Sequence, residues 1–92
     1  MKITVKYFGQ LRQVAGVEGE DGECPAETTV QDYLKNVAKR HEATFSRILF
    51  DEQDRLRPSV IVAINDAVVG RGRPCILKDN DQVTLLAAIA GG

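Results

Sequence analysis

The sequence predicts an α+β fold in which a mixed sheet of four to five strands curls around one main helix. Three patterns predict it. The first residues alternate apolar and polar side chains, as a half-buried strand does. A segment near the middle has the apolar spacing of an amphipathic helix, and the second half contains two apolar runs with the residue types of strands. A chain of 92 residues can bury one modest core, so we expect residues 1–92 to form a single domain.

The first expected strand covers residues 3–7, where Ile, Val and Tyr alternate with Thr and Lys. Phe8-Gly9 breaks this pattern, and Leu11 with Val14 has the spacing of a short helical turn. Three glycines then interrupt the acidic stretch 16–23. A second strand in that stretch would be weak and would lie at an edge of the sheet.

The main helix is expected to begin at Val30. Thr28 or Thr29 precedes it, and each is followed three residues later by a side-chain acceptor, which is the spacing of a capping box. His41 at the far end is better explained as a cap or a half-buried ring than as a ligand or base, because no Asp, Cys or Ser falls at a catalytic spacing. The apolar stripe recurs at i, i+3, i+4, i+7, i+8 and i+11, as Val30, Tyr33, Leu34, Val37, Ala38 and His41.

After this helix we expect a short helical turn at 45–50 over one end of the core, then a charged loop at 51–58. Val60–Ile64 is β-branched at nearly every position, which is typical of a central strand with two apolar faces. Asn65-Asp66 supplies a turn. The remaining expected elements are a short returning strand at Val68-Val69, core anchors at Ile76-Leu77 and a last strand from Gln82 to Ala88.

Composition excludes several classes of function. Twelve basic and thirteen acidic residues leave a formal charge of −1, which argues against a nucleic-acid binder held by phosphate neutralisation. The longest apolar run, residues 85–90, is far short of a membrane span, and no signal peptide is visible, so we expect no membrane partner and a cytoplasmic location. Cys24 and Cys75 have no CxxC spacing and the chain has a single His, so neither a zinc site nor a redox pair is indicated.

One helix between two pairs of strands is the element order of a β-grasp, in which the first and last strands are parallel neighbours at the centre of the sheet. The segments that carry a family resemblance are KYFGQLRQVAG, TTVQDYLKNVAKRH, VAINDAVV, LKDNDQVTLL and AIAGG. Together they span nearly the whole chain. They resemble the ubiquitin-like sulfur carriers, a family that includes the small subunit of molybdopterin synthase and the thiamine-pathway sulfur carrier.

The most specific part of the resemblance is Gly91-Gly92, placed directly after the last strand. Two features depart from the molybdopterin-synthase members: Ala87-Ala88, where those members commonly carry prolines, and the Gly-rich acidic second strand. The insertion SRILFDEQDRLRPS and the length are closer to a carrier that serves cysteine synthesis in some bacteria. The resemblance therefore implies a sulfur carrier and leaves the pathway open.

The resemblance implies a carrier protein rather than an enzyme. A ubiquitin-activating-type adenylating enzyme, using ATP and magnesium, would join the Gly92 carboxylate to AMP. A persulfide donor protein would then convert it to a thiocarboxylate. The sulfur would pass to an acceptor synthase, most simply the large molybdopterin synthase subunit, in molybdenum cofactor biosynthesis. We expect no cofactor or metal bound to this chain itself, and a flexible Gly91-Gly92 tail, because glycine without a β-carbon can thread into a partner's active site.

The last strand also predicts a partner-binding face. If Val83, Leu85, Ala87 and Ile89 point into the core, then Thr84, Leu86 and Ala88 point outward, beside Ile61 and Ala63 of the 60–64 strand. Apolar residues on an exposed sheet face indicate a docking patch, unless a loop of the chain covers them. The residues expected to contact partners are Ile61, Ala63, Leu86, Ala88, Ile89 and Ala90.

Other classes of function remain to be distinguished. The runner-up carriers serve cysteine or thiamine biosynthesis. A ubiquitin-like modifier would instead be joined through Gly92 to lysines of target proteins and would form heavier conjugates. A β-grasp binding module without terminal chemistry would be indifferent to the loss of Gly91 and Gly92. An independent catalyst is disfavoured, because no nucleophile, general base and orienting group can be assembled from the spacings.

Overall fold

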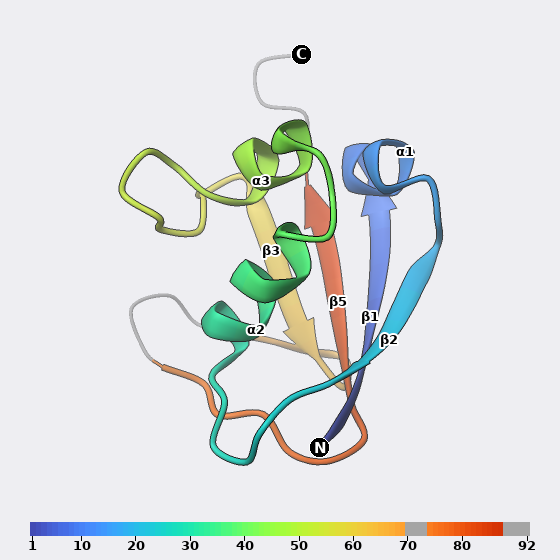
Figure 1. Ribbon diagram of the computed structural model, residues 1–92, viewed down its shortest axis with the longest axis vertical. Coiled ribbons are helices and arrows are strands. Elements are labelled where there is room, and N and C mark those ends of the chain that lie inside the picture. The colour runs from blue at the N-terminus through green and yellow to red at the C-terminus, as the bar shows by residue number, and fades with distance from the viewer. Residues whose placement is uncertain (70–73, 88–92) are drawn as a thin grey trace.

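The computed structural model describes residues 1–69 and 74–87. Over this part of the chain, a five-stranded mixed sheet has the order β2-β1-β5-β3-β4, and the helices lie on one face of it (Figure 1). The predicted α+β architecture, a mixed sheet around one main helix, is confirmed. Along the chain the elements are β1 (Lys2–Gly9), α1 (Gln10–Ala15), β2 (Gly19–Glu23), α2 (Val30–Ala38), α3 (Ala43–Leu49), β3 (Val60–Ile64), β4 (Ala67–Val68) and β5 (Asp81–Ala87).

The first and last strands are parallel neighbours, as predicted. Their ladder runs from Ile3 opposite Asp81 to Gly9 opposite Ala87. β5 also pairs antiparallel with β3, so β5 is the central strand. β3 lies inside the sheet, as predicted for Val60–Ile64, because it pairs with β5 on one side and with the two-residue edge strand β4 on the other. The two apolar faces of β3 have different surroundings. Val60 and Val62 face the core, whereas Ile61 lies on the open face of the sheet.

The acidic second strand lies at the opposite edge, as the glycines and charges predict. Within the described residues β2 has β1 as its single sheet neighbour, in antiparallel register from Lys2 opposite Glu23 to Lys6 opposite Gly19. None of its five residues is fully buried. The backbone ladder therefore provides most of the attachment of β2, apart from one side-chain cluster described below.

The main helix α2 begins as the capping spacing predicts. Thr29 is the residue before the helix, and its hydroxyl oxygen accepts a hydrogen bond from the Asp32 amide at 3.2 Å. The apolar stripe of α2 is buried and joins one core with β1, β3 and β5. The buried stripe consists of Val30, Tyr33, Leu34, Val37 and Ala38.

The other boundaries agree closely with the sequence. α3 buries Phe45 and Leu49 over one end of the core, as expected for the 45–50 turn. The returning strand β4 begins one residue earlier than predicted. Leu77 is a core residue, but its predicted companion Ile76 is 57% exposed, because consecutive residues of this extended segment point in opposite directions. No helix among the described residues has the length and apolarity needed to cross a membrane.

Candidate functional site

The last strand carries two different faces. Val83, Leu85 and Ala87 are buried in the core, whereas Leu86 is 39% exposed on the opposite face. This is the phase that the sequence predicted. The remaining predicted site residues, Ala88, Ile89, Ala90, Gly91 and Gly92, lie outside the described residues. We call these five residues the carrier terminus.

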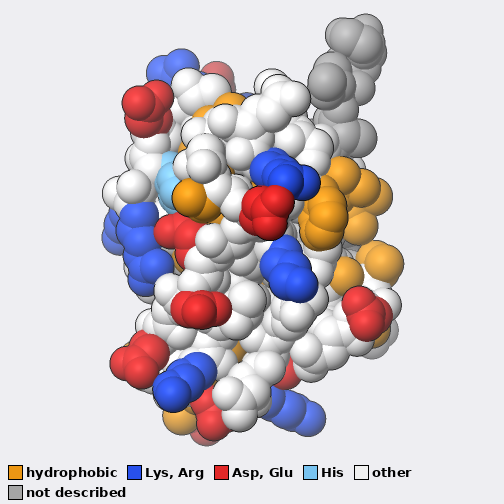
Figure 2. Space-filling model, turned by 90° about the vertical axis from the view of Figure 1, so that its right-hand side faces the viewer, with side chains coloured by type: hydrophobic (Ala, Val, Ile, Leu, Met, Phe, Trp, Pro, Cys, Tyr) orange, Lys and Arg blue, Asp and Glu red, His pale blue; other side chains and the backbone are white. Residues whose placement is uncertain are grey.

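An apolar row crosses the open face of the sheet at the end where β5 stops. Leu86 is flanked in register by Phe8 on β1 and by Ile61 on β3. Phe8 and Ile61 are each 44% exposed. Figure 2, which looks onto the β2 side, shows hydrophobic side chains gathered along the side away from the helices. The apolar row, defined as Phe8, Leu86 and Ile61, is the centre of the candidate docking face.

The open face becomes more polar with distance from this row. The next row places Lys6, Thr84 and Ala63 side by side, with the strongly exposed Val68 at the β4 edge. Beyond it Thr4 lies opposite Gln82. The apolar part of the face is thus concentrated beside Ala87, the residue after which the carrier terminus begins.

Three of the predicted contact residues lie on this face. Ile61 and Leu86 are exposed, and Ala63 is half-buried beside them. The alternative that a loop covers the face is not supported in the described part of the chain, because Phe8, Leu86 and Ile61 remain open to solvent.

The sequence pattern predicts Phe8 only as a break in the first strand, so Phe8 is absent from the predicted contact residues. The signal was present. Ile3, Val5 and Tyr7 are buried, so strand periodicity places the next residue on the outer face. An aromatic residue out of phase with its strand's buried side is a candidate contact residue.

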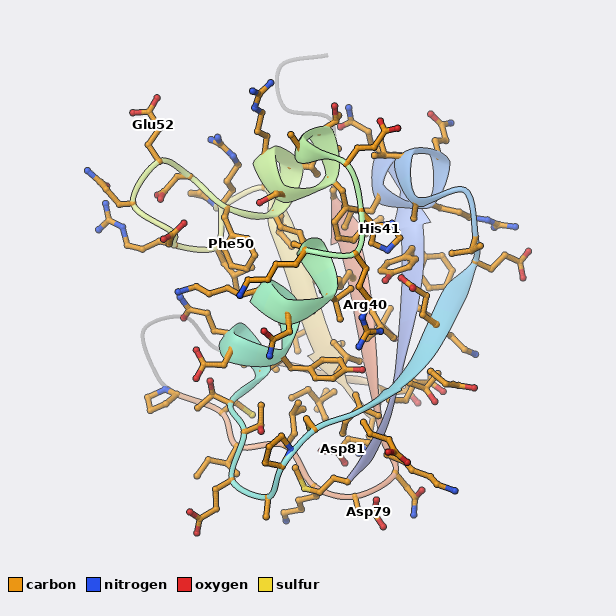
Figure 3. All side chains as sticks on the ribbon, viewed as in Figure 1. Arg40, His41, Phe50, Glu52, Asp79 and Asp81 are labelled. Carbon is orange, nitrogen blue, oxygen red and sulfur yellow. The ribbon has the colours of Figure 1, made fainter. Side chains whose placement is uncertain are left out.

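A cluster of polar and aromatic side chains lies on the helix side of the sheet. The Tyr7 hydroxyl on β1 donates a hydrogen bond to Glu20 on β2, and His41 Nε2 lies 2.5 Å from the same carboxylate oxygen. The His41 ring stacks on Phe45, with 4.3 Å between ring centroids. Figure 3 shows Arg40 and His41 together beyond the end of α2, beside β1 and β2. The sequence expectation of a half-buried His41 ring is confirmed.

Burial, hydrogen bonds and nearby charges in this cluster shift the pKa values of Glu20 and Tyr7. Burial raises the pKa of the Glu20 carboxyl, but the hydrogen bonds from Tyr7 and His41 and the nearby positive charges outweigh it, so the pKa is lowered. Burial, reinforced by the Glu20 carboxylate, raises the pKa of the Tyr7 hydroxyl well above its ordinary value. The cluster therefore keeps an ionised Glu20 between two donors, which holds β2 against the rest of the fold.

Other reactive side chains are dispersed. In residues 1–69 and 74–87 no three His, Cys, Asp or Glu side chains gather closely enough to hold a metal ion. Cys24 is a buried free thiol and Cys75 a half-buried one.

Comparison with known proteins decides the family. The ThiS family matches residues 5–92, nearly the whole chain. The chain belongs to the ThiS family. This is the ubiquitin-like sulfur carrier family that the sequence resembles, and its β-grasp fold agrees with the topology in Figure 1.

Three relatives of this ThiS-family chain are informative. The molybdopterin synthase sulfur carrier subunit of Chlamydomonas reinhardtii is 28% identical over 100% of both chains. The structure of a putative molybdopterin converting factor, subunit 1, from Pyrococcus furiosus is 35% identical, with a TM-score of 0.73 and coverage of 97% and 99%. SAMP1 of Haloferax volcanii, a small archaeal modifier protein, is 25% identical, with a TM-score of 0.85 and full coverage of both chains. The proteins to which the chain is similar thus include a sulfur carrier subunit and a small archaeal modifier protein.

Proposed function

We propose that this ThiS-family chain carries sulfur as a thiocarboxylate on Gly92 and donates it in molybdopterin synthesis. The observation that carries the proposal is the full-length similarity to a molybdopterin synthase sulfur carrier subunit, in a family match that runs through Gly92. The apolar row beside the last residue of β5 supports it, because a carrier must be held by partners close to its reacting end.

The first chemical step is activation of a poor acyl donor. A Gly92 carboxylate oxygen attacks the α-phosphorus of ATP, and pyrophosphate leaves, so an acyl adenylate forms. The partner supplies ATP and magnesium. This chain supplies the carboxylate and the surface by which it is held. No side chain of this protein needs to act as acid, base or nucleophile.

The second step replaces oxygen by sulfur. The terminal sulfur of a persulfide on the donor protein attacks the acyl carbon, and AMP leaves. A thiol then attacks the donor-side sulfur of the acyl disulfide, which forms a new disulfide and releases the Gly92 thiocarboxylate. The thiocarboxylate sulfur attacks an electrophilic carbon of the substrate bound to the acceptor synthase, and the oxygen leaving group on that carbon departs with its bonding electrons. Hydrolysis of the resulting acyl bond regenerates the carboxylate and leaves sulfur on the product.

Geometry limits how partners use the carrier terminus. Its five residues span at most about 18 Å when fully extended, so a partner's reacting groups must lie within that distance of Ala87. Binding at the apolar row would place the partner at the start of this segment. Glycine at positions 91 and 92 would pass through a narrow channel that side chains would obstruct.

A large synthase subunit is the proposed acceptor, since the Chlamydomonas relative is itself named as a subunit of such a synthase. The competing proposal is conjugation of Gly92 to target lysines, which similarity to a small archaeal modifier favours. Both begin with adenylation. They differ in the product, because a carrier accumulates a free thiocarboxylate and a modifier accumulates heavier conjugates.

Pyrophosphate release tests the shared first step. With the adenylating enzyme of the same organism, ATP and magnesium, we expect release that depends on this chain. Deletion of Gly92, or addition of one residue beyond it, should abolish release because the reacting carbon is misplaced in the partner's site. Equal release from the truncated chain would reject Gly92 as the activated group. A denaturing gel of the same reaction, with the persulfide donor and candidate target proteins added, then distinguishes the two proposals. Heavier conjugates of the chain would indicate a modifier, and their absence with a free thiocarboxylate would indicate a carrier.

A further inference from the structure

Gly9 lies directly against the point where the carrier terminus leaves the sheet. It is the last residue of β1 and stands opposite Ala87, the last residue of β5, in the final pair of the parallel ladder. Ala87 also pairs with Val60 on the other side and is buried. The strand is therefore held from both sides up to its last residue.

The backbone at Gly9 has a conformation that side chains disfavour. Its φ is 65° and its ψ is −137°, close to a region that is almost confined to glycine. This conformation lets β1 pass directly into α1, which begins at the next residue. The chain therefore reverses its course in immediate contact with the end of β5.

A side chain at this position would press on β5. A β-carbon added to Gly9 would lie 3.0 Å from the Ala87 carbonyl oxygen and 3.3 Å from Cδ1 of Leu86. The leucine methyl group can rotate away. The carbonyl oxygen belongs to the backbone and can move only with the end of the strand.

We infer that Gly9 is a positioning residue for activation of Gly92: without a side chain, it lets the end of β5 take the position from which the carrier terminus reaches the partner's active site. The inference rests on the proposed function. Displacing Ala87 displaces the start of the segment that ends in the reacting carbon. In reactions between bound groups, a misplacement of about 1 Å can lower the rate on the order of 100-fold.

Gly16 provides a matched control at the other end of the same helix. It follows α1, and its φ of 75° is also positive. Apart from its chain neighbours, no atom of residues 1–69 and 74–87 would lie within 4 Å of a β-carbon added there. Gly9→Ala and Gly16→Ala therefore both place a side chain on a backbone with positive φ beside α1. Of the two added methyl groups, the one at position 9 contacts β5.

Steady-state pyrophosphate release measures the effect. For Gly9→Ala we expect kcat to fall at least about tenfold, with KM within about threefold of wild type because the apolar row can still bind. Gly16→Ala should keep both constants within about twofold. Circular dichroism establishes that each variant is folded. If Gly9→Ala does not fold, Ala87→Gly, which loosens the same point without adding atoms, should show the fall in kcat instead.

A folded Gly9→Ala with unchanged kcat would overturn the inference, as would a rise in KM alone, which would make Gly9 part of the docking face. If kcat fell equally in Gly9→Ala and Gly16→Ala, the cause would be backbone strain at the ends of α1 and not contact with β5, and the inference would be rejected. If Ala87→Gly is the variant measured, a wild-type kcat overturns the inference. Failure of the proposed function is a separate outcome, because the wild-type chain would then release no pyrophosphate and the inference would fall with it.

Discussion

Glu20 connects three parts of the molecule through one carboxylate. Its partners Tyr7 and His41 are 13 and 21 residues away in sequence, and His41 in turn stacks on Phe45 of α3. Since the carboxylate is only partly exposed, its two hydrogen bonds are sheltered from water. β2 contributes little apolar burial, so Glu20 is the main side-chain attachment of this edge strand, in addition to its backbone ladder with β1.

Glu20→Gln keeps the size of the side chain and an acceptor oxygen but removes the charge. We expect the free energy of unfolding near neutral pH to fall by about 1–3 kcal/mol, because a charged acceptor between two donors is lost. The pKa of Glu20 is lowered from 4.5 in the folded protein. Its stabilisation is therefore complete above the unfolded value and is lost as the pH falls through the lower folded pKa.

Urea unfolding of both proteins from about pH 7 to about pH 3 measures this dependence. The two stabilities should converge in acid. Glu18→Gln is the control, because Glu18 is largely exposed and pairs with Arg12 on the surface, so its effect should stay within about 0.5 kcal/mol. A gap between wild type and Glu20→Gln that is the same at every pH would mean that the ionised carboxylate is not the stabilising group.

The sequence predicts those features of the structure that depend on residues a few positions apart. The strand phase of residues 3–7, the buried stripe of α2 and the cap at Thr29 are set by neighbours a few positions apart, and the sequence shows them directly. The Glu20 cluster joins residues of β1, β2 and the segment after α2, which only the tertiary fold brings together, so no sequence spacing could indicate it. Ile76 was placed in the core on its residue type alone, which says nothing about the direction of a side chain in an irregular segment.

The open face of the sheet is a property of three strands together. β1, β5 and β3 each contribute one member of the apolar row, and the register places them side by side. The sequence predicted Leu86 and Ile61, because both follow from the phase of a single strand. The phase of β1 places Phe8 on the same face, but that all three side chains lie in one row depends on the register of β1, β5 and β3, which the sequence does not give.

Leu86→Asp tests this face at its centre. We expect the affinity for the adenylating enzyme to fall at least about 30-fold, since a central apolar contact would become a buried unpaired charge. Gln82→Asp adds the same charge to the same face of β5 outside the apolar row, and it should change affinity by less than about threefold. Titration calorimetry gives both values. If the two variants bind equally well, or if Leu86→Asp fails to fold, Leu86 is not established as a partner contact.

In the whole molecule, the two faces of the sheet have different surroundings. The helices and the core occupy one face of the sheet, and the other face is left open with its apolar part at the end of β5 (Figure 1). Asp79 and Asp81 belong to the other end of β5, where Asp81 accepts hydrogen bonds from Asn65 and the Lys78 amide (Figure 3). One end of the strand is thus fixed by polar contacts, and the other end leads into the proposed reacting segment.

The central claim is that sulfur is carried on the Gly92 carbonyl carbon and on no side chain. The most direct measurement incubates the chain with its adenylating enzyme, ATP, magnesium, a persulfide donor and a thiol, followed by intact and tandem mass spectrometry. The account predicts a mass increase equal to replacement of one oxygen by sulfur, located on Gly92, and the same increase in a Cys24→Ser, Cys75→Ser variant. A persulfide on Cys24 or Cys75, accepted equally well by a chain that lacks Gly92, would contradict it.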